Sequence, residues 1–104
     1  YSDGINAATG DATGWSNMQS NAASKNKQLW MTETSGYDDT WVGNSFDLAK
    51  AIYLALRFGK VNAWVWWSLY GNGGVETLTT NGTPTKRYYV SKNYYRYIWK
   101  FRVM

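Results

Sequence analysis

Glu33, a carboxylate at the end of a short apolar run, is the residue of this sequence from which chemistry is most readily argued. The run 29–31 is too brief for a helix, and its lack of polar alternation is typical of a strand covered on both faces in a parallel sheet. We therefore predict a strand near 28–33, ending at the edge where such sheets carry active sites. The alternative is that Glu33 lies in a solvated turn.

The composition limits the other chemistry that the chain can perform. Its 104 residues are 44% hydrophobic and include seven Trp and nine Tyr, which predicts one small folded domain rather than a disordered chain. The absence of Cys and His excludes disulfides, thiolate and histidine metal ligands, and Ser-His or Cys-His dyads. We expect no metal and no cofactor. No apolar stretch approaches the roughly 18 residues of a membrane span, so we expect no membrane partner.

Charge is divided unevenly along the chain. Residues 1–49 hold six acids and two bases, whereas residues 50–104 hold nine bases and one acid. A basic, aromatic half raises the hypothesis of nucleic-acid binding. However, the bases of residues 86–97 are interspersed among aromatics, as on the solvated face of an amphipathic helix. We therefore do not expect a nucleic-acid partner.

Apolar spacing predicts helices near 15–24, 45–58 and 87–99, and residues 1–14 are predicted to be a loop. The central helix is the clearest, because its apolar residues form one stripe: Leu48, Ile52, Ala55 and Leu56. Asn44 is the predicted N-cap, with Asp47 as its capping-box partner, and Gly59 is predicted to end the helix at the C′ position.

A second strand is predicted near 61–69, before the glycines at 71–74. Strand, loop 34–43, helix and strand make a βαβ unit, whose strands should be parallel and adjacent with a right-handed crossover. Glu33 and Trp67 then face the same edge. Residues 75–78 are predicted as a β segment and 79–84 as a turn, with Pro84 near the start of the last helix. The tryptophans expected in the core are Trp30, Trp64 and Trp66.

In this order the elements resemble the C-terminal part of a glycoside hydrolase family 30 enzyme, a retaining hydrolase of the large (β/α)8 clan. Leu-Trp-Met-Thr-Glu at 29–33 resembles the family's nucleophile strand, and Asn-Ala-Trp-Val-Trp-Trp at 62–67 resembles its eighth strand. Residues 87–98 are similar to its last barrel helix, and Tyr-Ser-Asp-Gly at 1–4 is similar to the segment after its strand six. The fold class that this resemblance implies is α/β, with residues 1–104 as part of a TIM barrel: strands seven and eight with flanking helices.

The resemblance implies that Glu33 is the nucleophile of a β-glycan hydrolase acting on xylan, β-glucan or β-galactan. Trp67 becomes the expected sugar platform, and the loop aromatics expected to contribute to substrate binding are Trp41, Tyr37 and Tyr70. The family's general acid, a Glu on strand four, has no counterpart here. The nearby candidates for a substitute general acid are Glu76, Asp38 and Asp39. We expect each of them to be a surface carboxylate instead.

A part-barrel raises two further expectations. Its strand edges invite pairing, so we expect association with the remaining barrel or self-association. The resemblance also implies a secreted protein that meets a polysaccharide or oligosaccharide. The alternative function is a non-catalytic carbohydrate-binding module with an aromatic platform around Trp67.

Overall fold

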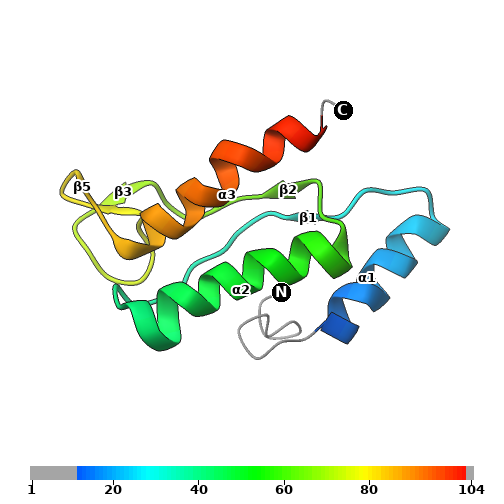
Figure 1. Ribbon diagram of the computed structural model, residues 1–104, viewed down its shortest axis with the longest axis horizontal. Helices are drawn as coiled ribbons and strands as arrows, with labels where there is room; N and C mark the ends of the chain where they lie inside the picture. The colour runs from blue at the N-terminus through cyan, green and yellow to red at the C-terminus, as the bar shows by residue number, and fades with distance from the viewer. Residues whose placement is uncertain (1–11, 103–104) are drawn as a thin grey trace.

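The computed structural model describes residues 12–102, with side chains as far as Ile98. Predictions for residues 1–11 lie outside this range. Two parallel strands run past the helices, and a small second sheet lies at one end (Figure 1). In chain order the elements are α1 (Ala12–Ser24), β1 (Trp30–Met31), η2 (Trp41–Ser45), α2 (Phe46–Leu54), η3 (Ala55–Gly59), β2 (Ala63–Trp64), β3 (Tyr70–Gly71), β4 (Thr79–Thr80), β5 (Thr83–Pro84) and α3 (Lys86–Arg102).

The predicted βαβ unit is confirmed, because β1 and β2 pair in parallel with Trp30 opposite Ala63. Both strands are shorter than predicted, at two residues each. Backbone hydrogen bonds nevertheless extend the pairing: Asn62 N donates to Leu29 O at 2.8 Å and Trp67 N to Thr34 O at 2.9 Å. The carboxyl ends of the two strands are therefore side by side, as the sequence predicted.

Helix α1 begins at Ala12, three residues before the predicted start, and so includes the end of the predicted loop. Its Asn and Ser residues are weak helix formers, so tertiary packing must supply much of its stability. That packing centres on Trp15, which is fully buried with Leu54, Ala55 and Val61. Trp15 thus packs α1 against η3, the π-helical segment that ends the central helix.

The predicted C′ role of Gly59 is wrong. Gly59 is the last residue of η3, and the left-handed conformation falls on Lys60, with φ of 49°. A Cβ added at Gly59 would lie 2.6 Å from Cε3 of Trp15. Glycine is required here because the indole ring packs directly on the backbone, not because the helix needs a left-handed cap.

Helix α2 carries the predicted apolar stripe, with Leu48, Ile52 and Ala55 buried and Leu56 half-buried. The predicted capping by Asn44 is not what the structure shows. Asn44 Nδ2 donates to Thr40 Oγ1 at 2.8 Å, and Asn44 Oδ1 accepts from Asp38 N at 3.2 Å. These partners in the preceding loop engage the amide, so it orders that loop instead of the helix terminus.

The two faces of the β1–β2 pair differ in burial. Trp64 and Trp66 pack toward the helices, and Trp66 joins Leu48 and Ile52 in a second core cluster. The expectation that Trp30 lies in the core is wrong, since its side chain is 60% exposed. Trp30 follows the helix-facing residue Leu29 and points to the opposite side of the strand. The described helices cover only one side.

The region 70–84 holds more strand than predicted, and the β segment expected at 75–78 is absent from this stretch. Instead β4 pairs in parallel with β3 and antiparallel with β5. Asn81 and Gly82 connect the hairpin with φ of 49° and 84°, as a type I′ turn requires. Asn-Gly between Thr79-Thr80 and Thr83-Pro84 was the sequence signal for this hairpin.

Helix α3 starts within one residue of its predicted position and runs three residues past its predicted end. Thr85 caps it, because Thr85 Oγ1 accepts a hydrogen bond from Tyr88 N at 3.3 Å while donating to Leu78 O at 2.7 Å. Pro84 lies just ahead, in β5. The cap therefore also attaches the helix start to the second sheet.

Candidate functional site

Glu33 is exposed at the carboxyl end of β1, beside the end of β2. Val65 N donates to Met31 O at 2.9 Å, and Trp67 N donates to Thr34 O at 2.9 Å. From the first bond to the second, the chain after β2 moves on by two residues, from Val65 to Trp67. The chain after β1 moves on by three residues, from Met31 to Thr34. An extra residue on one strand interrupts the alternation of side chains and is a common way to redirect one beside an active site. That extra residue falls at Thr32–Glu33.

Trp67 and Tyr70 present large aromatic surface near this edge. Trp67 is 59% exposed and Tyr70 is 64% exposed. The Trp67–Ser68 peptide bond is cis, and Ser68 Oγ donates to Tyr70 O at 3.2 Å. Because Trp67 N bonds to the carbonyl next to Glu33, the carboxylate and the indole belong to neighbouring backbone positions. The strand ends therefore bring to one edge an exposed carboxylate and an exposed aromatic residue, two residue types that a sugar site uses.

The backbone of Glu76 is attached to the end of β2. The carbonyl of Glu76 accepts hydrogen bonds from Trp66 Nε1, at 2.9 Å, and from the backbone N–H of Ser68. One residue earlier, Val75 O accepts from Gly36 N at 3.1 Å. The loop that contains Glu76 therefore lies against both strand ends. The side chain of Glu76 is exposed.

The loop aromatics Tyr37 and Trp41 have different surroundings from Trp67. Tyr37 is half-buried, with its ring 6.1 Å from that of Trp66. Burial raises the pKa of the Tyr37 hydroxyl, and the negative charge of Asp47 raises it further. Trp41 stacks on Phe46, with ring centroids 5.6 Å apart, and Lys86 Nζ lies 6.0 Å from its ring centre. Tyr37 thus supports Trp66, while Trp41 lies where α2 and α3 begin.

Asp39 has a structural role at the start of α3. Its Oδ1 accepts a hydrogen bond from Lys86 N at 2.7 Å and lies 3.9 Å from Lys86 Nζ. A carboxylate is favourable at a helix N-terminus, where backbone N–H groups lack partners. Asp39 therefore acts as a distant cap. Its neighbour Asp38 is exposed.

Arg87 is a residue that our sequence reasoning did not single out. It is 0% exposed. Its guanidinium donates to Thr77 O from Nε at 3.0 Å and Nη2 at 2.8 Å, to Tyr37 O from Nη1 at 2.8 Å, and to Gly74 O from Nη2 at 3.0 Å. Burial lowers the pKa of Arg87, while the charges of Asp39 and Asp38 act in the opposite direction.

A sequence signal for Arg87 was present. It falls on the same helical stripe as Val90, Ser91 and Tyr94, at spacings of three, four and seven. Val90 and Ser91 are buried and Tyr94 is half-buried. A base on the buried face of a helix needs partners. Here those partners are loop carbonyls.

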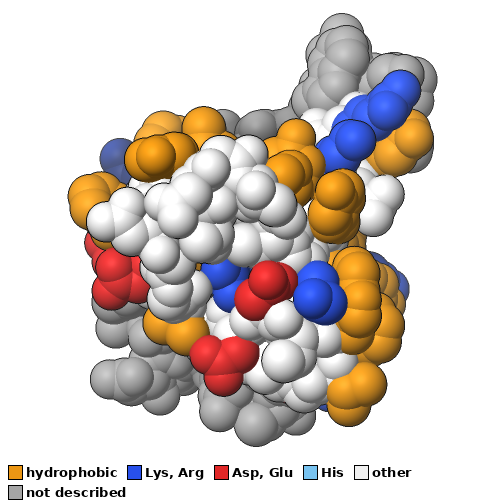
Figure 2. Space-filling model, turned by 90° about the vertical axis from the view of Figure 1, so that its left-hand side faces the viewer, with side chains coloured by type: hydrophobic (Ala, Val, Ile, Leu, Met, Phe, Trp, Pro, Cys, Tyr) orange, Lys and Arg blue, Asp and Glu red, His pale blue; other side chains and the backbone are white. Residues whose placement is uncertain are grey.

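Figure 2 views the end of the molecule at which these loops meet, the left-hand side of Figure 1. Acidic and basic side chains lie among uncharged side chains and backbone on this end, and hydrophobic side chains border it (Figure 2). Within residues 12–102, no three acidic side chains are grouped so that they could hold a metal ion. No helix in that range is long and apolar enough to cross a membrane.

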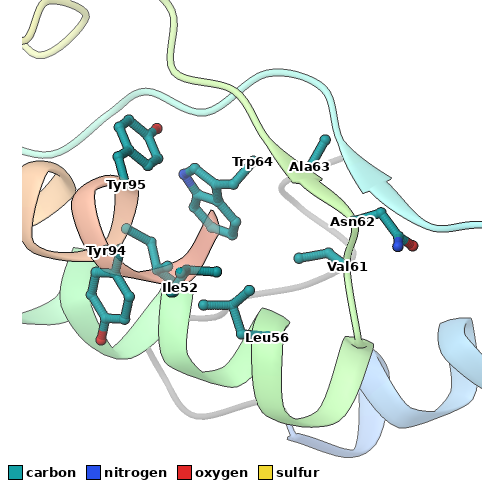
Figure 3. A pocket seen from close by; sticks show the side chains of 9 residues that line it. Ile52, Leu56, Val61, Asn62, Ala63, Trp64, Tyr94 and Tyr95 are labelled. Atoms are coloured by element: carbon teal, nitrogen blue, oxygen red, sulfur yellow. The ribbon is translucent and has the colours of Figure 1, made fainter. Parts of the chain in front are cut away.

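A cavity of about 290 Å³ lies elsewhere, between α2, β2 and α3 (Figure 3). Trp64, Tyr95, Ile52 and Leu56 contribute to its mainly apolar wall, which includes neither Glu33 nor Trp67. The neighbouring Tyr94 hydroxyl donates to Ala49 O at 2.8 Å and so joins α3 to α2. The cavity is thus separate from the site at the strand ends.

Glu33 and Trp67 lie at the carboxyl ends of two parallel strands of a βαβ unit. In α/β barrel enzymes the active site lies at this end of the strands. No family model matches the sequence, and no curated protein sequence matches it. Among solved structures, a GH30 endoxylanase from Clostridium papyrosolvens is similar, with 33% identity and a TM-score of 0.62. The match covers 81% of this chain and 22% of the endoxylanase chain.

This similarity gives partial support to the resemblance inferred from sequence. It supports a relationship to GH30 enzymes, a glycoside hydrolase-like fold and a partial barrel. The chain spans less than a quarter of the length of the endoxylanase that it matches.

Proposed function

We propose that this chain contributes the nucleophile half of a retaining β-glycan hydrolase site, with Glu33 as nucleophile and Trp67 as the platform under the reacting sugar. One observation supports the proposal: the backbone hydrogen bond from Trp67 N to Thr34 O joins the two strand ends at which the exposed residues Glu33 and Trp67 lie. Xylan is the first candidate substrate, because the similar structure is an endoxylanase. β-Glucan and β-galactan are the next candidates.

The proposed reaction needs two carboxyl groups about 5 to 5.5 Å apart. The Glu33 carboxylate attacks the anomeric carbon while the glycosidic C–O bond breaks and the leaving oxygen takes a proton from a general acid. Water, deprotonated by that same group, then attacks the anomeric carbon and releases Glu33. We assign the general acid/base to a residue outside 12–102. The Asp39 carboxylate is engaged at α3.

Trp30, Val65 and Trp67 form the open face of the β1–β2 pair, and all three are exposed. We propose that further parallel strands, from the remaining barrel or from a second copy of the chain, cover Trp30 and Val65, whereas Trp67 at the strand end stays open to the sugar. Light scattering coupled to size exclusion measures the mass in solution. Because such glycans are extracellular polymers, secretion is part of the proposed function.

An activated substrate tests the nucleophile separately from the missing acid. A dinitrophenyl 2-deoxy-2-fluoro-xylobioside has a leaving group that departs without protonation, and the fluorine slows release of the glycosyl-enzyme. We expect a covalent adduct on the peptide that contains Glu33, detected by mass spectrometry. Glu33→Gln should abolish the adduct, whereas Glu76→Gln, the matched exposed carboxylate, should leave it unchanged. Equal labelling of Glu33→Gln would refute the assignment.

A carbohydrate-binding module is the second candidate, favoured by the exposure of Trp67 and Tyr70. It predicts retention on xylan in affinity electrophoresis that survives Glu33→Gln and weakens in Trp67→Ala. Retention of this kind without any labelling of Glu33 would favour the module over the hydrolase.

A further inference from the structure

Arg87 joins the two loops that leave the strand ends. The first loop follows β1 and is held at Tyr37 O; the second precedes β4 and is held at Gly74 O and Thr77 O. The residues joined in this way lie 50 and 10 to 13 positions from Arg87 in sequence. One side chain on α3 therefore bridges two loops that are far apart from each other in sequence.

The same loops also carry the backbone of the candidate site. The first loop bonds to β2 through Thr34 O and Trp67 N, and to the second loop through Gly36 N and Val75 O. The segment from Glu33 to Tyr37 is thus held by Trp67 at one end and Arg87 at the other. The second loop is in turn held to β2 by Glu76 O.

The guanidinium is suited to this task in a way that other side chains are not. It presents five N–H donors in a rigid plane, and Nε, Nη1 and Nη2 of Arg87 all donate to carbonyls. Lysine would offer three donors from a single atom. A neutral side chain would leave buried carbonyls without partners, which is costly. Arginine is therefore the side chain whose donors best match the carbonyls around this buried position.

We propose that Arg87 is a positioning residue that sets Glu33 relative to Trp67, without itself contacting the sugar. The inference rests on the proposed function for the sugar, but its effect on the loops is independent of any ligand. Order in the segment 34–37 and reactivity of Glu33 should therefore change together when Arg87 is altered.

Amide hydrogen exchange and Glu33 labelling test this in the full chain. In Arg87→Met the exchange of the Gly36 amide should accelerate by at least about tenfold, because a hydrogen bond network of a charged group is lost. Labelling of Glu33 should slow by about 10²-fold, the cost of misplacing a reacting group by roughly 1 Å. Arg96→Met, which removes an exposed base from the same helix, is the matched control.

Chemical rescue separates positioning from general loss of stability. In Arg87→Ala, guanidinium at concentrations far below denaturing ones should restore both Gly36 protection and labelling, whereas ammonium should not. Arg87→Lys should behave like Arg87→Met. Wild-type exchange at Gly36 in Arg87→Met, or full function of Arg87→Lys, would overturn the positioning role. Absence of labelling in the wild-type chain would instead overturn the proposed function, and the exchange measurement would still decide the role of Arg87.

Discussion

Tryptophan lies on both faces of the β1–β2 pair, buried on one face and exposed on the other. Trp66 points toward the helices, is 8% exposed and donates its indole N–H to Glu76 O. Trp67, the next residue, is left open. Adjacent tryptophans thus divide between core and candidate platform. The difference shows that the contribution of an aromatic residue is set by which face of the strand the helices cover, because burial and not residue type stabilises the fold.

The largest expected effect separates Trp66 from Trp67. Trp66→Ala should lower the free energy of unfolding by about 3 to 5 kcal/mol, because it empties a packed site and removes a partner of Glu76 O. Trp67→Ala should change it by only about 0.5 kcal/mol, as is usual for a surface substitution, while weakening retention on xylan. Urea denaturation and affinity electrophoresis measure the two quantities. Equal destabilisation by both variants would contradict the comparison.

An intermediate effect is expected at Gly59 on the covered side. Gly59→Ala favours helix intrinsically by about 1 kcal/mol. The added methyl, however, would meet the buried Trp15 ring at 2.6 Å. We expect a net loss of about 1 to 3 kcal/mol of stability from overpacking. A double-mutant cycle with Trp15→Leu measures the coupling, and additive effects would show that the ring and the glycine do not interact.

The smallest effect on stability is expected on the open face. Trp30→Thr keeps a good strand former and removes an exposed ring, so the free energy of unfolding should change by less than about 0.5 kcal/mol. Its effect should instead appear in association: if this face pairs with further strands, the variant should have a lower average mass in light scattering at equal concentration. A loss of several kcal/mol would show that Trp30 is buried within the chain.

Local patterns were sufficient for the central part of the fold. Periodicity in 45–58 and two apolar runs predicted the helix and both strands, and chain order then required a parallel pair. The same reasoning brought Glu33 and Trp67 to one edge, which the Trp67–Thr34 hydrogen bond bears out at the level of backbone. The catalytic role of Glu33 and the substrate contacts remain predictions that the experiments above address.

Two local motifs were assigned the wrong role because other partners engage the residue concerned. Asn44 looked like a cap, but Asp38 and Thr40 engage its side chain. Gly59 looked like a helix terminator, yet its neighbour across the fold is Trp15. In both cases the residue type was correctly recognised as special. The partners of Asn44 lie in the loop just before the helix, on the other side from the helix terminus, whereas the partner of Gly59 comes from a different helix.

By itself the sequence determined the order of the three helices and of strands β1 and β2, the parallel β1–β2 pairing and the position of one carboxylate at a strand end. These follow from hydrophobic period and connection length, which are local properties of the chain. Only the tertiary structure decided which strand face stays open, that the 70–84 region adds a second sheet, and that Arg87 ties together loops as far as 50 residues away. The open face depends on where the helices pack, and the Arg87 contacts depend on pairing buried polar groups between remote segments, which leaves little trace in local periodicity.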